Sequence, residues 1–331
     1  MTETNKPEQN VPEQEQGTSF SDALEASKAK AESDPAGPKA TAPTRTLWSD
    51  AWKRLKKNKL AVAGAVWIIF MVVVALTADL WAPQWLGSPT DIDTTTVAQN
   101  SKLPPSAEHP FGTDATGRDQ LVRVIYGARV SLTVGVIATL ISTVIGLIMG
   151  ALAAFYGGWF DTIIMRLADM FLAIPYTLFV ITLLAVMGQG IQNVFIAIGI
   201  LGWPSIARVF RSAILSVKEN DYVDAARAMG ASDFRIIARH IFPNSVASIV
   251  VYATMNIGGA ILTESALSYL GMGVTPPTPS WGIMIQDGQT FLQTQPWLMI
   301  MPGLAILTTV LAFTLLGDGL RDALDVKMKD A

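Results

Sequence analysis

Six stretches of apolar residues alternate with polar segments along the chain. The first, Leu60–Ala78, has no charged side chain, and a helix of its length crosses a hydrocarbon layer of about 30 Å. The other five are similar in character, and they are Val130–Phe155, Ile163–Met187, Ile191–Phe210, Val246–Leu270 and Trp297–Leu316. A buried core helix is the alternative for the first stretch. Its length and its basic flank favour a membrane span, so the pattern predicts an all-α integral membrane protein with six transmembrane helices.

Basic side chains are distributed unevenly between the polar segments. Five of them precede the first span, at Lys53, Arg54, Lys56, Lys57 and Lys59, and others follow the fourth and sixth spans. Segment 271–296 has none, and segment 79–127 has three. Because basic loops stay in the cytoplasm, both termini are predicted to be cytoplasmic, with an external insertion at 79–127.

Composition narrows the class of protein further. Of the 331 residues, 50% are hydrophobic and 15% are charged, and the mean hydropathy is +0.38. These values do not fit an ordinary soluble domain or a wholly disordered chain. Cysteine is absent and there are two histidines, which excludes disulfides and cysteine-ligated metal centres. The net charge of −3 gives no indication of nucleic-acid binding.

The N-terminal segment differs from the rest of the chain. It is rich in Glu, Gln, Ser, Thr, Pro and Ala and has almost no aromatic residues. Such a segment buries too little apolar surface to offset the entropy of ordering it. We therefore predict a disordered cytoplasmic tail over 1–47 and a transmembrane domain over 48–331.

The polar interval 211–243, between the fourth and fifth spans, is predicted to contain two short helices. In the first, four residues recur at helical spacing and form a narrow apolar face: Tyr222, Ala225, Ala226 and Met229. Gly230 stands where a left-handed C-cap is expected. The second helix begins after Ser232, and Pro243 is expected to end it before the fifth span. The two helices lie either on the membrane surface or on the ends of the protein's own helices, or they dock a cytosolic partner.

A motif in this interval carries a resemblance to a known family. Asp224-Ala225-Ala226, Gly230 and then His240-Ile241-Phe242-Pro243 resemble the cytoplasmic coupling motif of bacterial ABC-importer permeases. That motif usually has Glu, Ile and Leu where this chain has Asp224, His240 and Phe242. The resemblance implies that a cytosolic ATPase is coupled through one group of residues, namely Tyr222, Asp224, Ala225, Ala226, Met229, Gly230, His240 and Pro243.

Further motifs indicate the branch of this family. The segments 109–114, 267–271 and 317–322 look like signatures of dipeptide/oligopeptide permeases, and the match covers roughly residues 48–328. The resemblance implies the translocation subunit of an ATP-driven peptide importer in a bacterial cell membrane. It also implies a homologous second permease, two ATPases and an extracytoplasmic peptide-binding protein. ATP and Mg²⁺ are expected on the ATPases, and no cofactor is expected on this chain.

Polar residues inside the spans are the remaining candidates. Glu264 is expected near the outer end of the fifth span, where solvent is available, and a role at an outer gate is open. Pro175 is expected to kink the third span, with a bent pore-lining helix as its functional alternative. Arg166 and Asp169 favour a local ion pair, and Gly258-Gly259 favours close helix packing.

Other functional classes have little support in the sequence. It contains no P-loop, no H-E-x-x-H and no G-x-S-x-G, so an enzyme has little support. The resemblance implies a non-catalytic permease subunit instead. A secondary transporter is less favoured, since neither ion-coupling carboxylates nor an inverted repeat is visible. Nickel or another small solute stays open as an alternative cargo.

Overall fold

A computed structural model of the protein describes residues 47–324. Apart from Leu47, the predicted tail 1–47 lies outside the described residues. The helices are α2 Leu47–Leu55, α3 Lys59–Leu86, α4 Val97–Asn100, α5 Gln120–Tyr156, α6 Gly158–Ala173, α7 Tyr176–Met187, α8 Ile191–Lys218, α9 Asp221–Ala228, α10 Asp233–Ile236, α11 Phe242–Tyr269, α12 Trp281–Gly288 and α13 Trp297–Leu324. No named strand occurs within residues 47–324, which confirms the all-α prediction.

Five helices are long and apolar enough to cross a membrane, namely α3, α5, α8, α11 and α13. The predicted third span is divided between α6 and α7, whose axes differ by 89°, so there are six spans if this pair counts as one. Ile174 is extended, with φ −89° and ψ 131°. Pro175 forces this because its ring excludes helical geometry in the preceding residue. The expected kink is therefore a complete break.

Several helices extend well beyond the apolar stretches that predicted them. α5 begins ten residues before Val130, α13 continues past Leu316 to Leu324, and α3 continues to Leu86. Hydropathy marks where a helix is apolar, whereas its backbone hydrogen bonds continue into polar sequence. The segment between α3 and α5 is consequently 87–119, shorter than the insertion predicted at 79–127.

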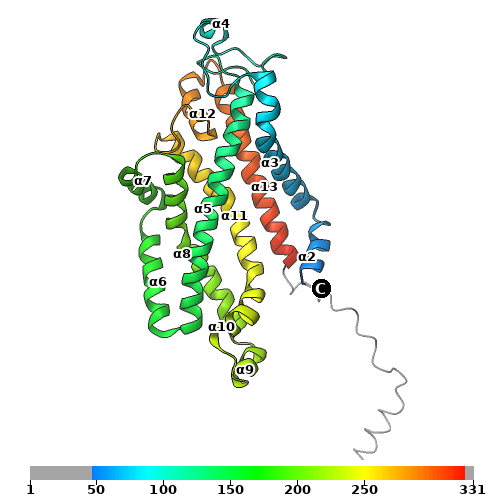
Figure 1. Cartoon of the computed structure of the whole chain (residues 1–331), viewed down its shortest axis with the longest axis vertical. Coiled ribbons are helices and arrows are strands. Elements are labelled where there is room, and N and C mark those ends of the chain that lie inside the picture. The colour runs from blue at the N-terminus through cyan, green and yellow to red at the C-terminus, as the bar shows by residue number, and fades with distance from the viewer. Residues whose placement is uncertain (1–46, 325–331) are drawn as a thin grey trace, which may run out of the picture. The chain divides into compact units, whose positions relative to one another are not determined.

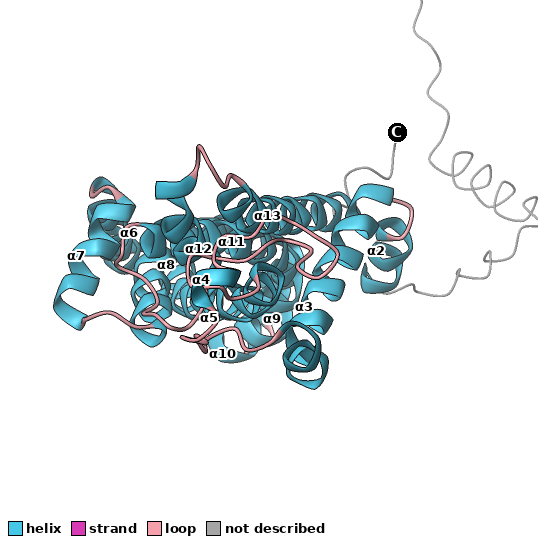
Figure 2. Ribbon diagram, turned by 90° about the horizontal axis from the view of Figure 1, so that it is seen from above, coloured by secondary structure: helices cyan, strands magenta, loops and turns pink. Residues whose placement is uncertain are grey.

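α5 forms the centre of the bundle and packs along α8, with α3 and α11 also against it (Figure 1). Glycines allow the close approach of α5 to α8. A Cβ added at Gly146 would lie 2.7 Å from Ile206 Cβ, and one at Gly150 would lie 2.7 Å from the Ala207 carbonyl oxygen. Any larger residue would separate the two helices. Seen from above, α6 and α7 lie at one side of the bundle and α2 at the other (Figure 2).

The two ends of the bundle carry different elements. α2, α9 and α10 lie at one end, and α4 lies at the opposite end (Figure 1). The basic residues before α3 and the interval 211–243 therefore share an end, as the charge pattern predicts. The predicted glycine packing of α11 is half right. Gly258 approaches Val310 of α13, with 3.4 Å from an added Cβ to Val310 Cγ1, whereas Gly259 faces open space.

Candidate functional site

The interval between α8 and α11 has the predicted turn. α9 ends in a Schellman motif, in which Ala231 N–H donates to the Ala226 carbonyl at 3.1 Å and Gly230 N–H donates to the Arg227 carbonyl at 3.0 Å. Gly230 has φ +80°, a left-handed conformation that favours glycine. An added Cβ at Gly230 would meet no atom within 4 Å. The glycine is therefore required by backbone conformation, not by space.

The apolar face of α9 differs from the one predicted. Val223 and Ala226 are buried, and Val223 belongs to a cluster that includes Phe155 of α5. Tyr222, Ala225 and Met229 are exposed, Met229 by 82%. The predicted stripe thus combined one residue of the buried face with three of the opposite face. The exposed three form a surface available to another protein.

The second predicted helix does not end at Pro243. α10 passes into a π-helical turn, Ile237–Ile241, which leads without a break into α11. Pro243 lies in the first turn of α11. Pro243 has no N–H to donate, and the change from π-helical to α-helical hydrogen bonding falls at this point of the chain. The backbone of His240 lies in the π-helical turn.

The departure at Asp224 has little structural consequence inside this chain. Asp224 is exposed, and its carboxylate lies 3.3 Å from Arg227 one turn later on α9. Exposed pairs of this type contribute about 0.2–1 kcal/mol. The Asp224 carboxylate is therefore accessible to groups other than residues 47–324.

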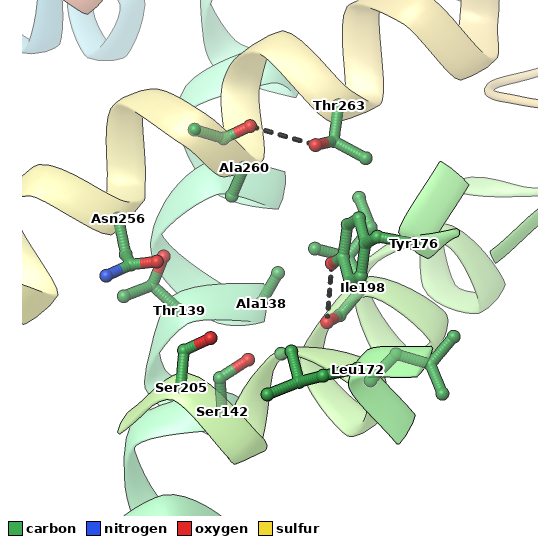
Figure 3. A pocket seen from close by; sticks show the side chains of 13 residues that line it. Ala138, Thr139, Ser142, Leu172, Tyr176, Ile198, Ser205, Asn256, Ala260 and Thr263 are labelled. Atoms are coloured by element: carbon green, nitrogen blue, oxygen red, sulfur yellow. Dashed lines mark hydrogen bonds between the residues drawn. The ribbon is translucent and has the colours of Figure 1, made fainter. Parts of the chain in front are cut away.

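A polar cavity of about 210 Å³ lies between α5, α8, α11 and the break separating α6 from α7 (Figure 3). Its polar lining comes from hydroxyl and amide side chains, with apolar and glycine residues between them. The polar lining residues are Thr139, Ser142, Tyr176, Ser205, Asn256 and Thr263. Charged side chains are absent from this lining.

The broken third span borders this cavity. Leu172 of α6 and Tyr176 of α7 line it on either side of Pro175. At membrane depth, non-helical backbone is tolerated where it is buried in protein or lines an aqueous cavity. The bend expected at Pro175 is present, and Leu172 and Tyr176 beside it line this cavity.

The sequence predictions did not include the cavity residues. Asn256, Gly259, Ala260 and Thr263 recur at helical spacing along α11 and all line the cavity. This repeat of small and polar residues along one face of an apolar span is the sequence signal that could have identified the cavity. A single hydroxyl in a span is common, so the signal is visible only when the face is considered as a whole.

Glu264 is not solvated, contrary to the sequence-based expectation. Its side chain has no exposed surface. Ser268 Oγ donates to its carboxyl at 2.7 Å and Ser131 Oγ of α5 donates at 2.9 Å. Counting residues along the helix predicts how deep Glu264 lies in the membrane, but it does not show which helices lie beside it. The buried group fastens α11 to α5.

At the opposite end from α9, ion pairs join the loop before α5 to α12. Arg123 lies 2.8 Å from Asp114 and 3.4 Å from Asp287. Burial would raise the pKa of the Asp114 carboxyl, but Arg123 and Arg118 outweigh it and hold that pKa below its ordinary value. For Asp287, burial prevails over Arg123 and the pKa is raised. The Asp114 carboxyl also accepts the backbone N–H groups of Thr116 and Arg118, so the loop before α5 is a structured turn.

Two smaller observations complete the survey of polar groups. Asp169 pairs with Arg166 at 3.7 Å, as predicted, and also with Arg208 of α8. Within residues 47–324, no three histidine, cysteine or acidic side chains are grouped so that they could hold a metal ion. Asp114, Asp169 and their arginine partners therefore pair with other residues of this chain.

The long apolar helices and the internal polar cavity define a multi-span membrane protein. The fold is similar to a chain in "Inward facing conformations of the MetNI methionine ABC transporter", with TM-score 0.52 and 18% identity, covering 62% of this chain and 97% of that chain. The chain therefore shares its fold with a chain of an ABC transporter.

The family follows from the sequence comparisons. A family model described as "Binding-protein-dependent transport system inner membrane component" matches residues 142–330. One described as "N-terminal TM domain of oligopeptide transport permease C" matches residues 46–105. The chain belongs to the binding-protein-dependent transport family as an inner membrane component. Membership implies ATPase subunits, a substrate-binding protein and a second permease as partners.

Characterised relatives cover most of the chain. It is 44% identical over 282 residues to the dipeptide transport system permease protein DppC of Alkalihalophilus pseudofirmus, covering 85% of this chain and 90% of the relative. It is also 44% identical over 285 residues to the glutathione transport system permease protein GsiD of Escherichia coli O6:K15:H31, covering 86% and 92%. The resemblance inferred from the motifs is confirmed.

Proposed function

We propose that the chain forms one half of the translocation pathway of an ATP-driven importer whose cargo is a dipeptide or short oligopeptide. The observation that carries this is the 44% identity to a dipeptide permease over 85% of the chain, together with the match of 46–105 to an oligopeptide permease domain. The cavity supports it, since an uncharged polar lining suits a cargo that must bind weakly and leave.

ATP binding and hydrolysis belong to the partner subunits in this proposal. One of the two ATPases, which hold ATP and Mg²⁺, contacts the exposed face of α9, formed by Tyr222, Ala225 and Met229. The opposite face of α9 joins the bundle through Val223, which belongs to a buried cluster with Phe155 of α5 and Ile214 of α8, so a displacement of α9 is passed to the bundle. Closure of the ATPases then switches the pathway between inward and outward access by rigid-body motion.

The orientation of the chain follows from its charges. The end that carries α2, α9 and α10 is cytoplasmic, because the basic segments lie there. Reporter fusions after Ser101 should then be active only outside the membrane, and fusions after Ser232 only inside. A cytoplasmic signal from the Ser101 fusion would contradict the orientation.

Reconstitution tests the proposed cargo. The complete complex, with the second permease, both ATPases and the binding protein, is placed in liposomes and supplied with ATP. Uptake of a radiolabelled dipeptide, a longer peptide, glutathione and Ni²⁺ is then compared. ATP-dependent uptake of at least one peptide, absent without the binding protein, is expected. Uptake of Ni²⁺ alone, or peptide uptake driven by an ion gradient without ATP, would contradict the proposal.

A further inference from the structure

The hydrogen-bond donors that line the cavity of Figure 3 are mostly committed to the protein itself. Tyr176 Oη donates to the Ile198 carbonyl at 3.1 Å and Thr263 Oγ1 donates to the Gly259 carbonyl at 3.0 Å (Figure 3). Two further donors are used in the same way. Ser142 Oγ donates to Gly199 O at 2.8 Å, and Asn256 Nδ2 donates to Tyr252 O at 2.8 Å.

Once these donors are used, oxygen acceptors outnumber the free donors of the lining, which are the second N–H of Asn256 and the hydroxyls of Thr139 and Ser205. A hydroxyl that donates its single proton still has acceptor capacity, and Asn256 retains its amide oxygen as an acceptor. Turning one of these side chains to donate elsewhere would give up its present hydrogen bond to a carbonyl. The cavity is therefore biased towards accepting hydrogen bonds from whatever enters it.

One buried polar atom of the cavity lining has no partner within the described residues. Thr139 is only 5% exposed and lines the cavity, yet its Oγ1 makes no hydrogen bond there. A buried hydroxyl without a partner is unfavourable. Thr139 is thus a group that a ligand or water in the cavity would satisfy, and it stands beside the accepting oxygens.

Charge and size restrict what can fill the cavity. Its lining carries no acidic or basic side chain to balance a full charge. The volume of about 210 Å³ is below the about 300 Å³ of a small ligand pocket, so it takes part of a cargo and not all of it. An uncharged group with N–H donors fits both limits, and the peptide main chain supplies it at every non-proline residue.

We propose that this cavity is an intermediate binding site for the peptide during translocation. It binds the main-chain amide N–H groups of the peptide, irrespective of its side chains. This inference rests on the proposed function, and it specifies which part of the cargo the cavity recognises. Asn256 and Thr263 of α11 are the accepting groups, and Thr139 of α5 completes the site. Because one neutral hydrogen bond changes a rate by about five-fold, such a site binds cargo without trapping it.

The test uses N-methylated cargo in the reconstituted complex. A peptide and its backbone N-methylated form are supplied on saturating binding protein, whose affinity for each is measured separately. The wild-type complex should take up the methylated form about five-fold more slowly. Asn256→Leu and the nearly isosteric Thr263→Val should slow uptake of the parent peptide by a similar factor and leave the methylated form unchanged.

A matched control lies on the same helix. Thr254 donates to the Val250 carbonyl at 2.8 Å, as Thr263 does to Gly259, but it does not line the cavity. Thr254→Val should therefore leave uptake of both peptides unchanged. Equal uptake of both peptides by the wild type would overturn the inference. So would variants that slow the two peptides equally.

The wild-type complex separates this inference from the proposed function. Peptide uptake that does not distinguish the methylated form leaves the proposed function intact and removes the amide site. If the complex takes up no peptide although it hydrolyses ATP with its loaded binding protein, the proposed function is wrong and the inference is overturned with it.

Discussion

Replacement of Gly230 tests whether the turn after α9 is needed for contact with the ATPase. Gly230 has φ +80°, and an added Cβ would have no neighbour within 4 Å. The only penalty of Gly230→Ala is thus the left-handed backbone, about 1–2 kcal/mol. If α9 must hold this turn to dock, the population able to dock falls by the corresponding factor, about 5- to 30-fold.

The assay is the affinity of the purified ATPase for the permease pair in detergent or nanodiscs. Gly230→Ala should weaken it within that range, and Gly230→Asn should weaken it less, because asparagine tolerates the left-handed region. Gly303→Ala is the control, since Gly303 also has open space around it but lies inside α13 without a positive φ. Wild-type affinity for Gly230→Ala, or equal losses for Ala and Asn, would refute the reasoning.

Three other predictions concern stability and assembly. Glu264→Leu should lower the melting temperature of the complex, because the Ser131 hydroxyl loses its acceptor at a cost of about 1–3 kcal/mol. Glu264→Gln should keep most of the stability, since its amide oxygen can still accept. Equal melting temperatures for the two variants would contradict this. Arg123→Met should destabilise by about 3–5 kcal/mol in the same scan. The pKa of Asp114 is lowered in the folded state, so the stability from its pairing with Arg123 is present above the ordinary pKa of an aspartate and is lost as the pH falls through the lowered pKa. This variant should therefore lose less stability on acidification than the wild type. Deletion of 1–43 should leave assembly and uptake intact, and loss of the complex from the membrane would reveal a docking role.

The face of α9 changes how docking should be probed. Ala226 is 5% exposed and points into the protein, so Ala226→Trp would displace α9 from the bundle whether or not a partner binds. Ala225 is exposed, and Ala225→Trp instead enlarges the surface offered to the ATPase. We expect Ala225→Trp to reduce ATPase affinity without lowering the melting temperature of the permease. An unchanged affinity would favour packing of this face on the membrane.

Features set by local chemistry were predictable from the sequence. The membrane spans follow from apolar length, and the turn at Gly230 follows from a helix of small residues ending at a glycine. The break at Pro175 was foreseen as a kink, and its size was not, because the neighbouring cavity that accepts free backbone is a tertiary feature. Local pattern also could not decide which face of α9 is buried.

Features that depend on several helices were not predictable. The burial of Glu264 is due to Ser131 of α5, far away in sequence. The cavity requires α5, α8 and α11 to be placed side by side, and its residues are individually ordinary. The hydroxyl of Thr139 becomes informative only when the structure shows that it is buried without a hydrogen-bond partner. Helix periodicity gives the faces, and the packing decides what each face meets.

Capture of cargo inside the cavity tests the central claim most directly. The native chain has no cysteine, so Ser205→Cys places a single thiol at the cavity and Thr308→Cys places one away from it. The complex is energised with ATP, and the binding protein delivers a cysteine-containing peptide under mild oxidation. A disulfide between the peptide and Ser205→Cys that requires both ATP and the binding protein, with none at Thr308→Cys, is predicted. Equal capture at the two positions, or capture at Ser205→Cys without ATP and the binding protein, would contradict a pathway through this cavity.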